Sequence, residues 1–190
     1  MTPQVPDTIL LQGVEHVLVA WDGTGLFSPR AHGLNPEWTS TNCYRGYTCT
    51  YAIGEGALRL RNVLFHDLGL SGPEEVPTLF GKSGHWSNGY VSYSFPNLEA
   101  EVPFCGALLA GSGWEKDEWK CIHPAEAFYR VHELTFEVGG RLSGIFDRTP
   151  DARELDALPR SWGFKDHELL RAWEKDHFRG SYLPPPLPRD

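Results

Sequence analysis

Hydrophobic and polar residues alternate along much of the chain, and the clearest alternation lies between Ser40 and Val63. In its first half, every second position carries an apolar side chain, namely Tyr47, Cys49, Tyr51 and Ile53. In its second half, Leu58 and Leu60 alternate with arginines, and the segment 54–56, Gly-Glu-Gly, separates the halves. Alternation on both sides of a glycine turn predicts a β-hairpin with one apolar face.

Further short strands are predicted on both sides of this hairpin. They cover 8–11, 15–20, 89–95, 99–109, 128–138 and 141–146. The run V-L-V-A that ends at Ala20 is apolar at every position, which predicts a strand buried on both faces. Regularly spaced short strands with glycine turns predict a mainly β fold, either an antiparallel β-sandwich or a partly open barrel.

The end of the chain changes to a helical pattern. Thr149-Pro150-Asp151 predicts a helix start, and a second helix is predicted at about 165–178. The prolines that follow predict an extended polyproline II segment. We therefore expect an α+β arrangement. A β-rich domain would cover 1–146, a helical extension packed on it would cover 147–182, and a proline-rich tail would cover 183–190.

The predicted hairpin also carries a resemblance. Y-R-G-Y-T-C-T-Y-A-I from Tyr44, followed by G-A-L-R-L, resembles a family of uncharacterised bacterial proteins with an aromatic-R-G-Y-x-A-T-W-E-I strand and a G-x-L-x-L strand. Cys49 stands where that family usually has alanine, and Tyr51 where it usually has tryptophan. H-E-L-T-F-E-V-G-G-R-L, ending at Leu142, is similar to the family's closing hairpin. The resemblance implies a β-rich fold and a bacterial origin, but no reaction and no functional residue.

The charge balance limits the kinds of partner that we expect. The formal net charge is −8, from 25 acidic and 17 basic residues. Nucleic-acid binding needs a clustered basic surface, so we expect no nucleic-acid partner. An acidic chain suits a basic protein partner or serves solubility alone. The sequence has no signal peptide and no apolar stretch of membrane-spanning length, which predicts a cytoplasmic protein without membrane contact.

The sequence contains no G-x-S-x-G, Walker A or G-x-G-x-x-G motif. Cys105 is the best-placed nucleophile, with His123 or His132 as its base, but no pattern in the sequence brings them together. A small buried cysteine is the favoured interpretation of Cys105. The histidines show no metal-ligand spacing, and the cysteines form no C-x-x-C pair, so we expect no metal and no cofactor.

Tryptophans in or beside predicted loops form a candidate binding surface. They are Trp21, Trp38, Trp86, Trp114 and Trp119. Exposed aromatic residues of this kind are binding hot spots, whereas buried ones cover the ends of a core. Burial is the commoner arrangement for such large side chains and is the favoured interpretation here.

These features favour a non-enzymatic protein-interaction module, of an inhibitor or immunity-like kind, with a basic protein as its partner. Formation of a homo-oligomer is left open. The alternative is an enzyme or a small-ligand-binding protein with a pocket formed by the loops 21–41 and 66–89. Convergent histidines and carboxylates in a deep pocket would favour an enzyme, and a flat aromatic surface would favour a module.

Overall fold

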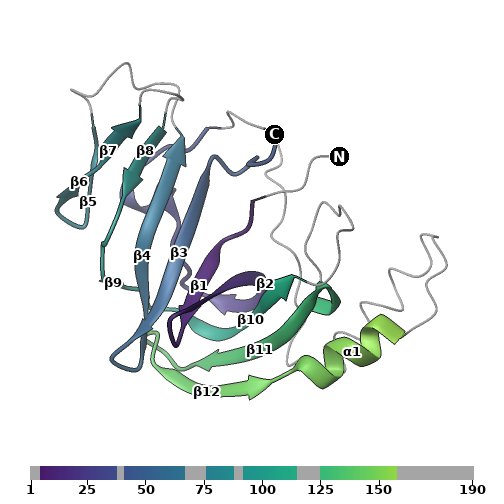
Figure 1. The fold of residues 1–190 in the computed structure, drawn as a ribbon. Coiled ribbons are helices and arrows are strands. Elements are labelled where there is room, and N and C mark those ends of the chain that lie inside the picture. The colour runs from purple at the N-terminus through teal and green to yellow at the C-terminus, as the bar shows by residue number, and fades with distance from the viewer. Residues whose placement is uncertain (1–4, 38–40, 67–75, 88–91, 115–124, 158–190) are drawn as a thin grey trace.

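The computed structural model describes residues 5–37, 41–66, 76–87, 92–114 and 125–157, and it is mainly β (Figure 1). The strands are β1 Thr8–Leu11, β2 Val14–Thr24, β3 Tyr47–Gly54, β4 Ala57–His66, β5 Thr78–Leu79, β6 Lys82–Ser83, β7 His85–Ser87, β8 Ser92–Phe95, β9 Ala100–Glu101, β10 Cys105–Trp114, β11 Phe128–Phe136 and β12 Leu142–Asp147. The helices are α1 Thr149–Ala157 and the short 3₁₀ helices η1 Pro29–His32 and η3 Ala125–Ala127. The predicted second helix and the proline-rich tail lie outside the described residues.

The predicted central hairpin is confirmed as β3 and β4. The two strands pair antiparallel along their length, ending at Gly54 opposite Ala57. Glu55 and Gly56 form the turn with φ of 53° and 75°. Two consecutive positive φ angles are those of the two-residue hairpin turn that matches strand twist. Gly54, which the sequence pattern assigns to the turn, belongs to β3 instead.

Ten strands form one mixed sheet. Its order is β12-β11-β10-β2-β1-β3-β4-β8-β7, with β9 also paired to β4. The paired strands in this sheet run antiparallel except β1 and β3, which run parallel with Thr8 opposite Thr50. A parallel neighbour needs a long connection, and β2 together with the segment 25–46 supplies it.

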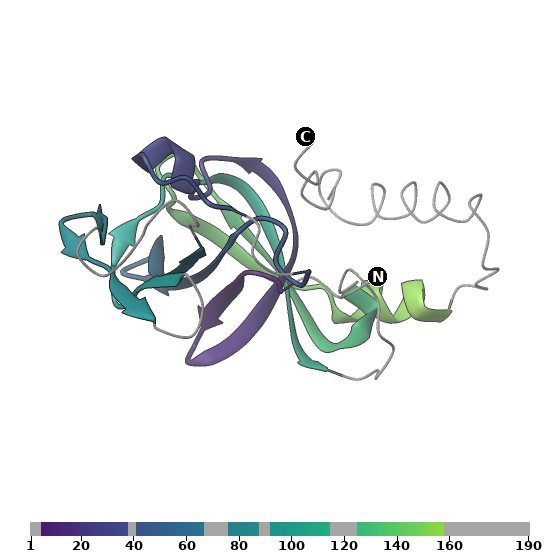
Figure 2. The ribbon, with the colours of Figure 1, turned by 90° about the horizontal axis from the view of Figure 1, so that it is seen from above.

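The sheet is strongly curled (Figure 2), and its two hairpin turns are joined by hydrogen bonds. The Leu58 N–H donates to the Gly140 carbonyl at 2.8 Å, and the Leu142 N–H donates to the Gly56 carbonyl at 2.8 Å. These bonds join the β3–β4 turn to the β11–β12 turn. The strand order does not close into a ring among the described residues. The fold is therefore the partly open barrel of the sequence prediction, built on a mixed sheet.

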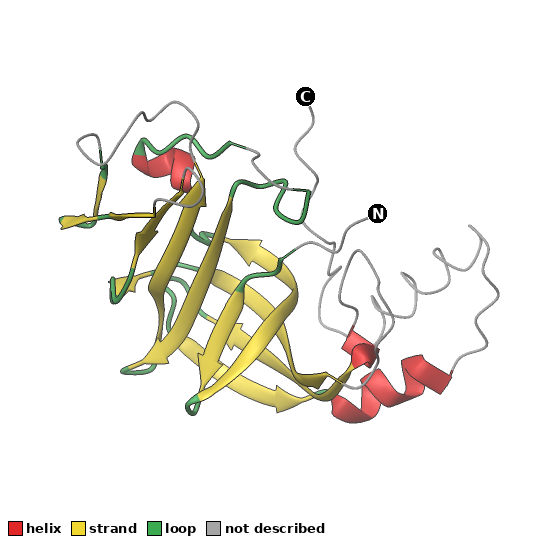
Figure 3. Ribbon diagram, turned by 45° about the horizontal axis from the view of Figure 1, so that its top comes forward, coloured by secondary structure: helices red, strands yellow, loops and turns green. Residues whose placement is uncertain are grey.

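The concave face of the sheet holds the main core. Its largest fully buried side chains are Tyr51, Tyr93, Phe65, Phe95, Phe104, Ile9, Leu58, Leu60, Leu79, Leu108 and Leu134. A second core lies on the opposite face of β2, β10 and β11, where η3 and α1 cover the sheet (Figure 3). Ala152 of α1 packs there and is 1% exposed. Strand β2 contributes to both cores, as its run of apolar residues predicts.

Two predicted boundaries change in the structure. The segment 99–109, predicted as one strand, is divided into β9 and β10 around Pro103, which has no N–H to give to a ladder. Strand β2 continues to Thr24, which pairs with Cys105 on β10. The turn-rich segment predicted to begin at Trp21 therefore begins after β2 ends.

The predicted helix start is confirmed at α1. The Thr149 N–H donates to the Asp147 carboxylate at 2.9 Å, which satisfies the first backbone N–H of the helix. The Thr149 hydroxyl accepts the Val131 N–H at 3.1 Å and ties the helix to β11. None of the helices in the described part of the chain is long and apolar enough to cross a membrane.

The contact between the two turns gives the first prediction. Gly140 has φ 80°, and a Cβ there would collide with the Val102 carbonyl oxygen. We expect Gly140→Ala to lower the free energy of unfolding by about 3 kcal/mol, from the left-handed backbone and the collision together. The measurement is urea unfolding followed by circular dichroism.

The matched control is Gly139→Ala. Gly139 has φ 89°, but a Cβ there would meet no atom within 4 Å. Only the backbone term of about 1 kcal/mol is expected. Equal losses for the two variants would show that the close approach of Gly140 to the Val102 carbonyl contributes nothing to stability.

Candidate functional site

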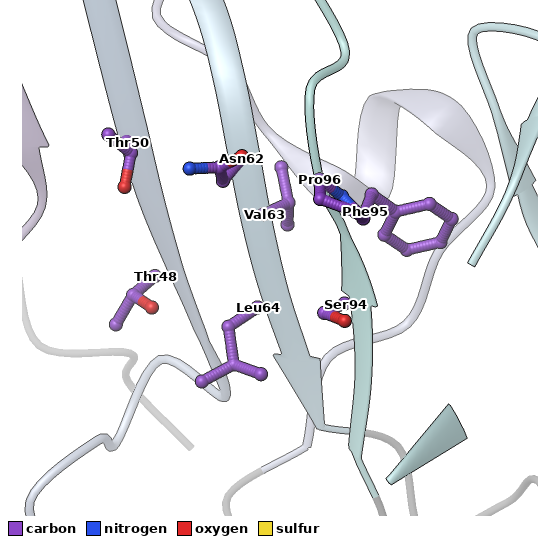
Figure 4. A pocket seen from close by; sticks show the side chains of 8 residues that line it. All are labelled: Thr48, Thr50, Asn62, Val63, Leu64, Ser94, Phe95 and Pro96. Atoms are coloured by element: carbon purple, nitrogen blue, oxygen red, sulfur yellow. The ribbon is translucent and has the colours of Figure 1, made fainter. Parts of the chain in front are cut away.

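One hollow lies on the convex face of β3, β4 and β8 (Figure 4). Its volume is about 240 Å³, and its lining residues are Thr48, Thr50, Asn62, Val63, Leu64, Ser94, Phe95 and Pro96. The lining offers hydroxyl and amide groups but contains no titratable side chain. Asn62 Oδ1 already accepts the Asn97 N–H at 3.0 Å. This hollow therefore supplies no acid, no base and no activated nucleophile.

A second hollow of about 180 Å³ lies on the concave face, near the β1–β2 turn. Its lining residues are Leu11, Gln12, Val14, His16, Ser112, Arg130, His132 and Ile145. Here the apolar row of the main core gives way to polar side chains. We call it the histidine hollow, and it is the candidate functional site of the described residues.

Strand register explains why two histidines meet there. Ala110 on β10 pairs with Leu18 on β2 and with His132 on β11, while Ser112 pairs with Arg130. Strands β2 and β11 flank β10 and are therefore about 9.6 Å apart. Because the side chains at 110 and 112 are small, the rings of His16 and His132 extend over β10. Their centroids lie 5.4 Å apart, with the ring planes at 72°.

The electrostatics of the hollow keep His16 neutral at pH 7. Burial lowers the pKa of His16, and the nearby His132 and Arg130 lower it further, against a hydrogen bond to the backbone that raises it. That bond joins Nδ1 of His16 to the Val14 carbonyl at 3.0 Å. Nδ1 donates to the carbonyl, so in the neutral ring Nε2 keeps a lone pair.

His132 has an unsatisfied nitrogen. Its Nδ1 is buried and has no hydrogen-bond partner within the described residues. Across the strand pair, Asp147 on β12 lies opposite His132. Hydrogen bonds from Thr149 lower the pKa of Asp147, so its carboxylate is charged at neutral pH. The lining of the hollow thus combines one arginine and two histidines, and the Asp147 carboxylate belongs to the residue paired with His132.

The structure does not bring the predicted nucleophile to this histidine. Cys105 precedes Ala110, the β10 partner of His132, by five positions, which separates the two by about 17 Å. His123 lies outside the described residues. Burial raises the pKa values of the Cys43 and Cys49 thiols, which keeps both protonated and poorly nucleophilic. Among the residues that the structure describes, no group of three or more His, Cys, Asp or Glu side chains could hold a metal ion.

The predicted tryptophan surface is divided. Trp21 and Trp86 are half-buried and pack against the main core. Trp114 is 40% exposed and contacts Phe128 edge-on, with ring centroids 5.1 Å apart. Trp21 pairs with Leu108, six positions before Trp114 on β10, so these two tryptophans are about 20 Å apart. Trp38 and Trp119 lie outside the described residues.

The described parts of the loops 21–41 and 66–89 pack together through aromatic rings. His32 stacks on Phe27 with centroids 5.2 Å apart, and Phe80 lies 4.8 Å from His32. Leu34 and Leu79, from the same two loops, are buried in the main core. These contacts close one end of the core, and both hollows described above lie away from them.

A buried ion pair between Asp7 and Arg45 was not expected from the sequence. Arg45 donates two hydrogen bonds to Asp7, at 2.8 and 2.9 Å, and the Cys49 N–H donates to the same carboxylate at 2.7 Å. Although burial alone lowers the pKa of Arg45, Asp7 raises it above its ordinary value. The guanidinium also lies 4.9 Å from the centre of the Tyr47 ring, whose pKa burial raises to about 12. Both carboxylate oxygens are occupied, so this pair organises structure.

The sequence contained a pattern that indicates the histidine hollow. His16 lies two positions before Leu18, and His132 lies two positions before Leu134. Because strands alternate with period two, both histidines had to share the core-facing side of their strands. Spacing within one strand does not reveal the pair, because β2 supplies one histidine and β11 supplies the other.

A scan against protein-family models, a search of curated proteins and a search of solved structures found no match to this chain. The resemblance of the β3–β4 and β11–β12 segments to a bacterial family therefore stays a prediction.

The Asp7–Arg45 pair gives the second prediction. Asp7→Asn removes the negative charge and leaves the guanidinium, which is 22% exposed, without a charged partner. We expect a loss of about 3 kcal/mol in the free energy of unfolding, near the lower end for breaking a buried pair. Chemical unfolding at pH 7 measures it.

Glu55→Gln is the control, because Glu55 pairs with Arg59 at 2.6 Å but is 85% exposed. Its cost should stay below about 1 kcal/mol. A similar small cost for Asp7→Asn would contradict a structural role for the buried pair.

Proposed function

We propose that this protein is a non-enzymatic protein-interaction module and that β12 is the strand on which its partner binds. The partner adds an extended segment to the open edge of the sheet, a common mode of peptide recognition. An inhibitor or immunity-like role is the form of module that we favour. We also propose a cytoplasmic location.

The observation that carries this proposal is the composition of β12. The strand stands at the end of the sheet order and, among the described residues, has β11 as its one paired neighbour. Its sequence, L-S-G-I-F-D, contains no lysine or proline, the residues that commonly protect an edge. Ile145 is 41% exposed, and Phe146, which lies beside the Arg148 guanidinium, is 38% exposed.

The regular part of this edge suits strand addition. From Gly144 to Asp147, β12 pairs with β11 without a shift in register, and the irregularity lies nearer Leu142. The opposite end of the sheet is β7, a strand of 3 residues. An added strand gains more backbone hydrogen bonds on the longer edge.

The charge of the chain supports a basic partner. The net charge of −8 favours encounter with positively charged proteins and disfavours encounter with nucleic acid. Asp147 lies on the proposed edge, and its lowered pKa keeps it negative at neutral pH. A basic side chain of the partner next to β12 can therefore form an ion pair with the Asp147 carboxylate.

The test compares two lysine substitutions of apolar residues, Ile145→Lys on β12 and Val138→Lys in the neighbouring turn, where Val138 is 87% exposed. Each variant and the unmodified chain is used to isolate partners, and the partner found is purified for titration calorimetry. We expect Ile145→Lys to weaken its binding at least about tenfold, because a charge is placed on the docking edge. Val138→Lys should bind as the unmodified chain does.

Equal affinity for the two variants would overturn the proposed edge. A nucleic acid or an acidic protein as partner would overturn the electrostatic part of the proposal. Sedimentation of the purified chain provides a further check. A dimer that Ile145→Lys dissociates would make a second copy of this chain the occupant of the edge.

A further inference from the structure

The histidine hollow has a polar lining that the interaction proposal does not use. Five of its lining side chains are polar, and they come from the β1–β2 turn and from β2, β10 and β11. The rows next to it hold buried Leu18, Leu108 and Leu134. Polar side chains that converge on one concave place beside a core are the usual composition of a ligand site.

We propose that the histidine hollow binds a small tetrahedral oxyanion, a sulfate or a phosphoryl group. The donors are the Arg130 guanidinium, the imidazoles of His132 and His16, and the Ser112 hydroxyl. Arginine and imidazolium groups form the strong, charge-assisted hydrogen bonds by which proteins hold such anions.

The size of the hollow limits the ligand. Its volume of about 180 Å³ is below the range of roughly 300–1,000 Å³ in which drug-sized ligands and cofactors bind. An anion with a few waters fits this space, and a nucleotide does not. Its inner side is formed by the buried Leu11 and His16, whereas Val14, Ile145 and Arg130 are exposed at its mouth, so an anion would enter from solvent at the arginine.

The charges around the hollow favour an anion over a cation. Arg130 is a fixed positive charge among the lining residues and repels a metal ion. The described residues also provide no set of three metal ligands. The opposing negative charge is Asp147, whose carboxylate is engaged by Thr149. Loss of that charge should therefore improve anion binding.

Binding is coupled to a proton on the histidine pair. In the neutral His16 ring, the bond to Val14 leaves Nε2 as an acceptor, so His16 must gain a proton before Nε2 donates to the anion. Arg130 on β11 and Asp147 on β12 are the charged groups that face the pair. Strands β1 and β10 contribute Ile9, Leu11, Ala110 and Ser112, none of which titrates. The affinity should rise as the pH falls.

The experiment is titration calorimetry of the full chain with sodium sulfate at constant ionic strength. Sulfate stays doubly charged between pH 5.5 and 7.5, so any pH dependence belongs to the protein. We expect binding about tenfold tighter at pH 5.5 than at 7.5, because the anion binds the form in which His16 carries a proton on Nε2, and lower pH favours that form. Long-range ¹H–¹⁵N spectra of the imidazoles should shift at His16 and His132 on addition of sulfate.

Matched variants separate a built site from general attraction. Arg130→Gln should weaken sulfate binding at least about tenfold, whereas Arg141→Gln, the same charge change at an exposed residue of the β11–β12 turn, should leave it unchanged. Asp147→Asn should tighten binding about threefold, because the amide oxygen still accepts the Thr149 N–H while the repulsion is gone. A folding defect cannot produce this gain.

Three results would overturn the proposal: no heat of binding at millimolar sulfate at pH 5.5, equal weakening by Arg130→Gln and Arg141→Gln, or affinity independent of pH. O-phosphoserine distinguishes the sources of the anion. If O-phosphoserine binds more tightly than sulfate, the natural ligand is a phosphoryl group carried on a larger molecule. If O-phosphoserine does not bind, the natural ligand is the free ion. These measurements need no protein partner, so their outcome does not depend on whether a partner binds to β12.

Discussion

The buried ion pair between Asp7 and Arg45 holds the sheet together at its weakest point. One half of the sheet is β12-β11-β10-β2 and the other is β3-β4-β8-β7, and β1, a strand of 4 residues, joins them. Three residue pairs form its parallel contact with β3. Asp7 directly precedes β1 and binds both Arg45 and the Cys49 N–H, which fixes the position of β3 relative to β1. The cost of burying these charges is offset because both carboxylate oxygens accept hydrogen bonds, three in all.

The two halves of the sheet differ in how many of their faces are buried. Strands β2, β10 and β11 are buried on both faces, by the main core and by the second core under α1 and η3. Strands β3 and β4 bury one face and turn threonine and asparagine outward. Rigid strands therefore carry the histidine hollow, and burial on both faces limits the movement of His16 and His132. A ligand site on such strands is held more firmly than one on loops.

Local patterns predicted the strands, the central hairpin and the first helix, because each depends on residues within about ten positions. The contacts that define the site are not local. Asp7 and Arg45 are 38 residues apart, and the two histidines lie on strands joined by the whole central part of the chain. The order of the sheet sets both contacts, and alternation within one strand contains no information on which strand is its neighbour. The parallel pairing of β1 with β3 could not be predicted from the sequence pattern for the same reason.

Strand β12 belongs both to the proposed docking edge and to the wall of the histidine hollow. Register places Ile145 opposite Leu134 and Asp147 opposite His132, so both side chains share the concave face with the hollow. A strand added to β12 would lie about 4.8 Å beyond it, within reach of Asp147. A basic side chain there neutralises the one carboxylate that opposes an anion, so partner and anion should strengthen each other's binding by the same factor. Sulfate should therefore tighten binding of the partner to the unmodified chain and have a smaller effect with Asp147→Asn. An unchanged effect in that variant would show that the two sites act independently.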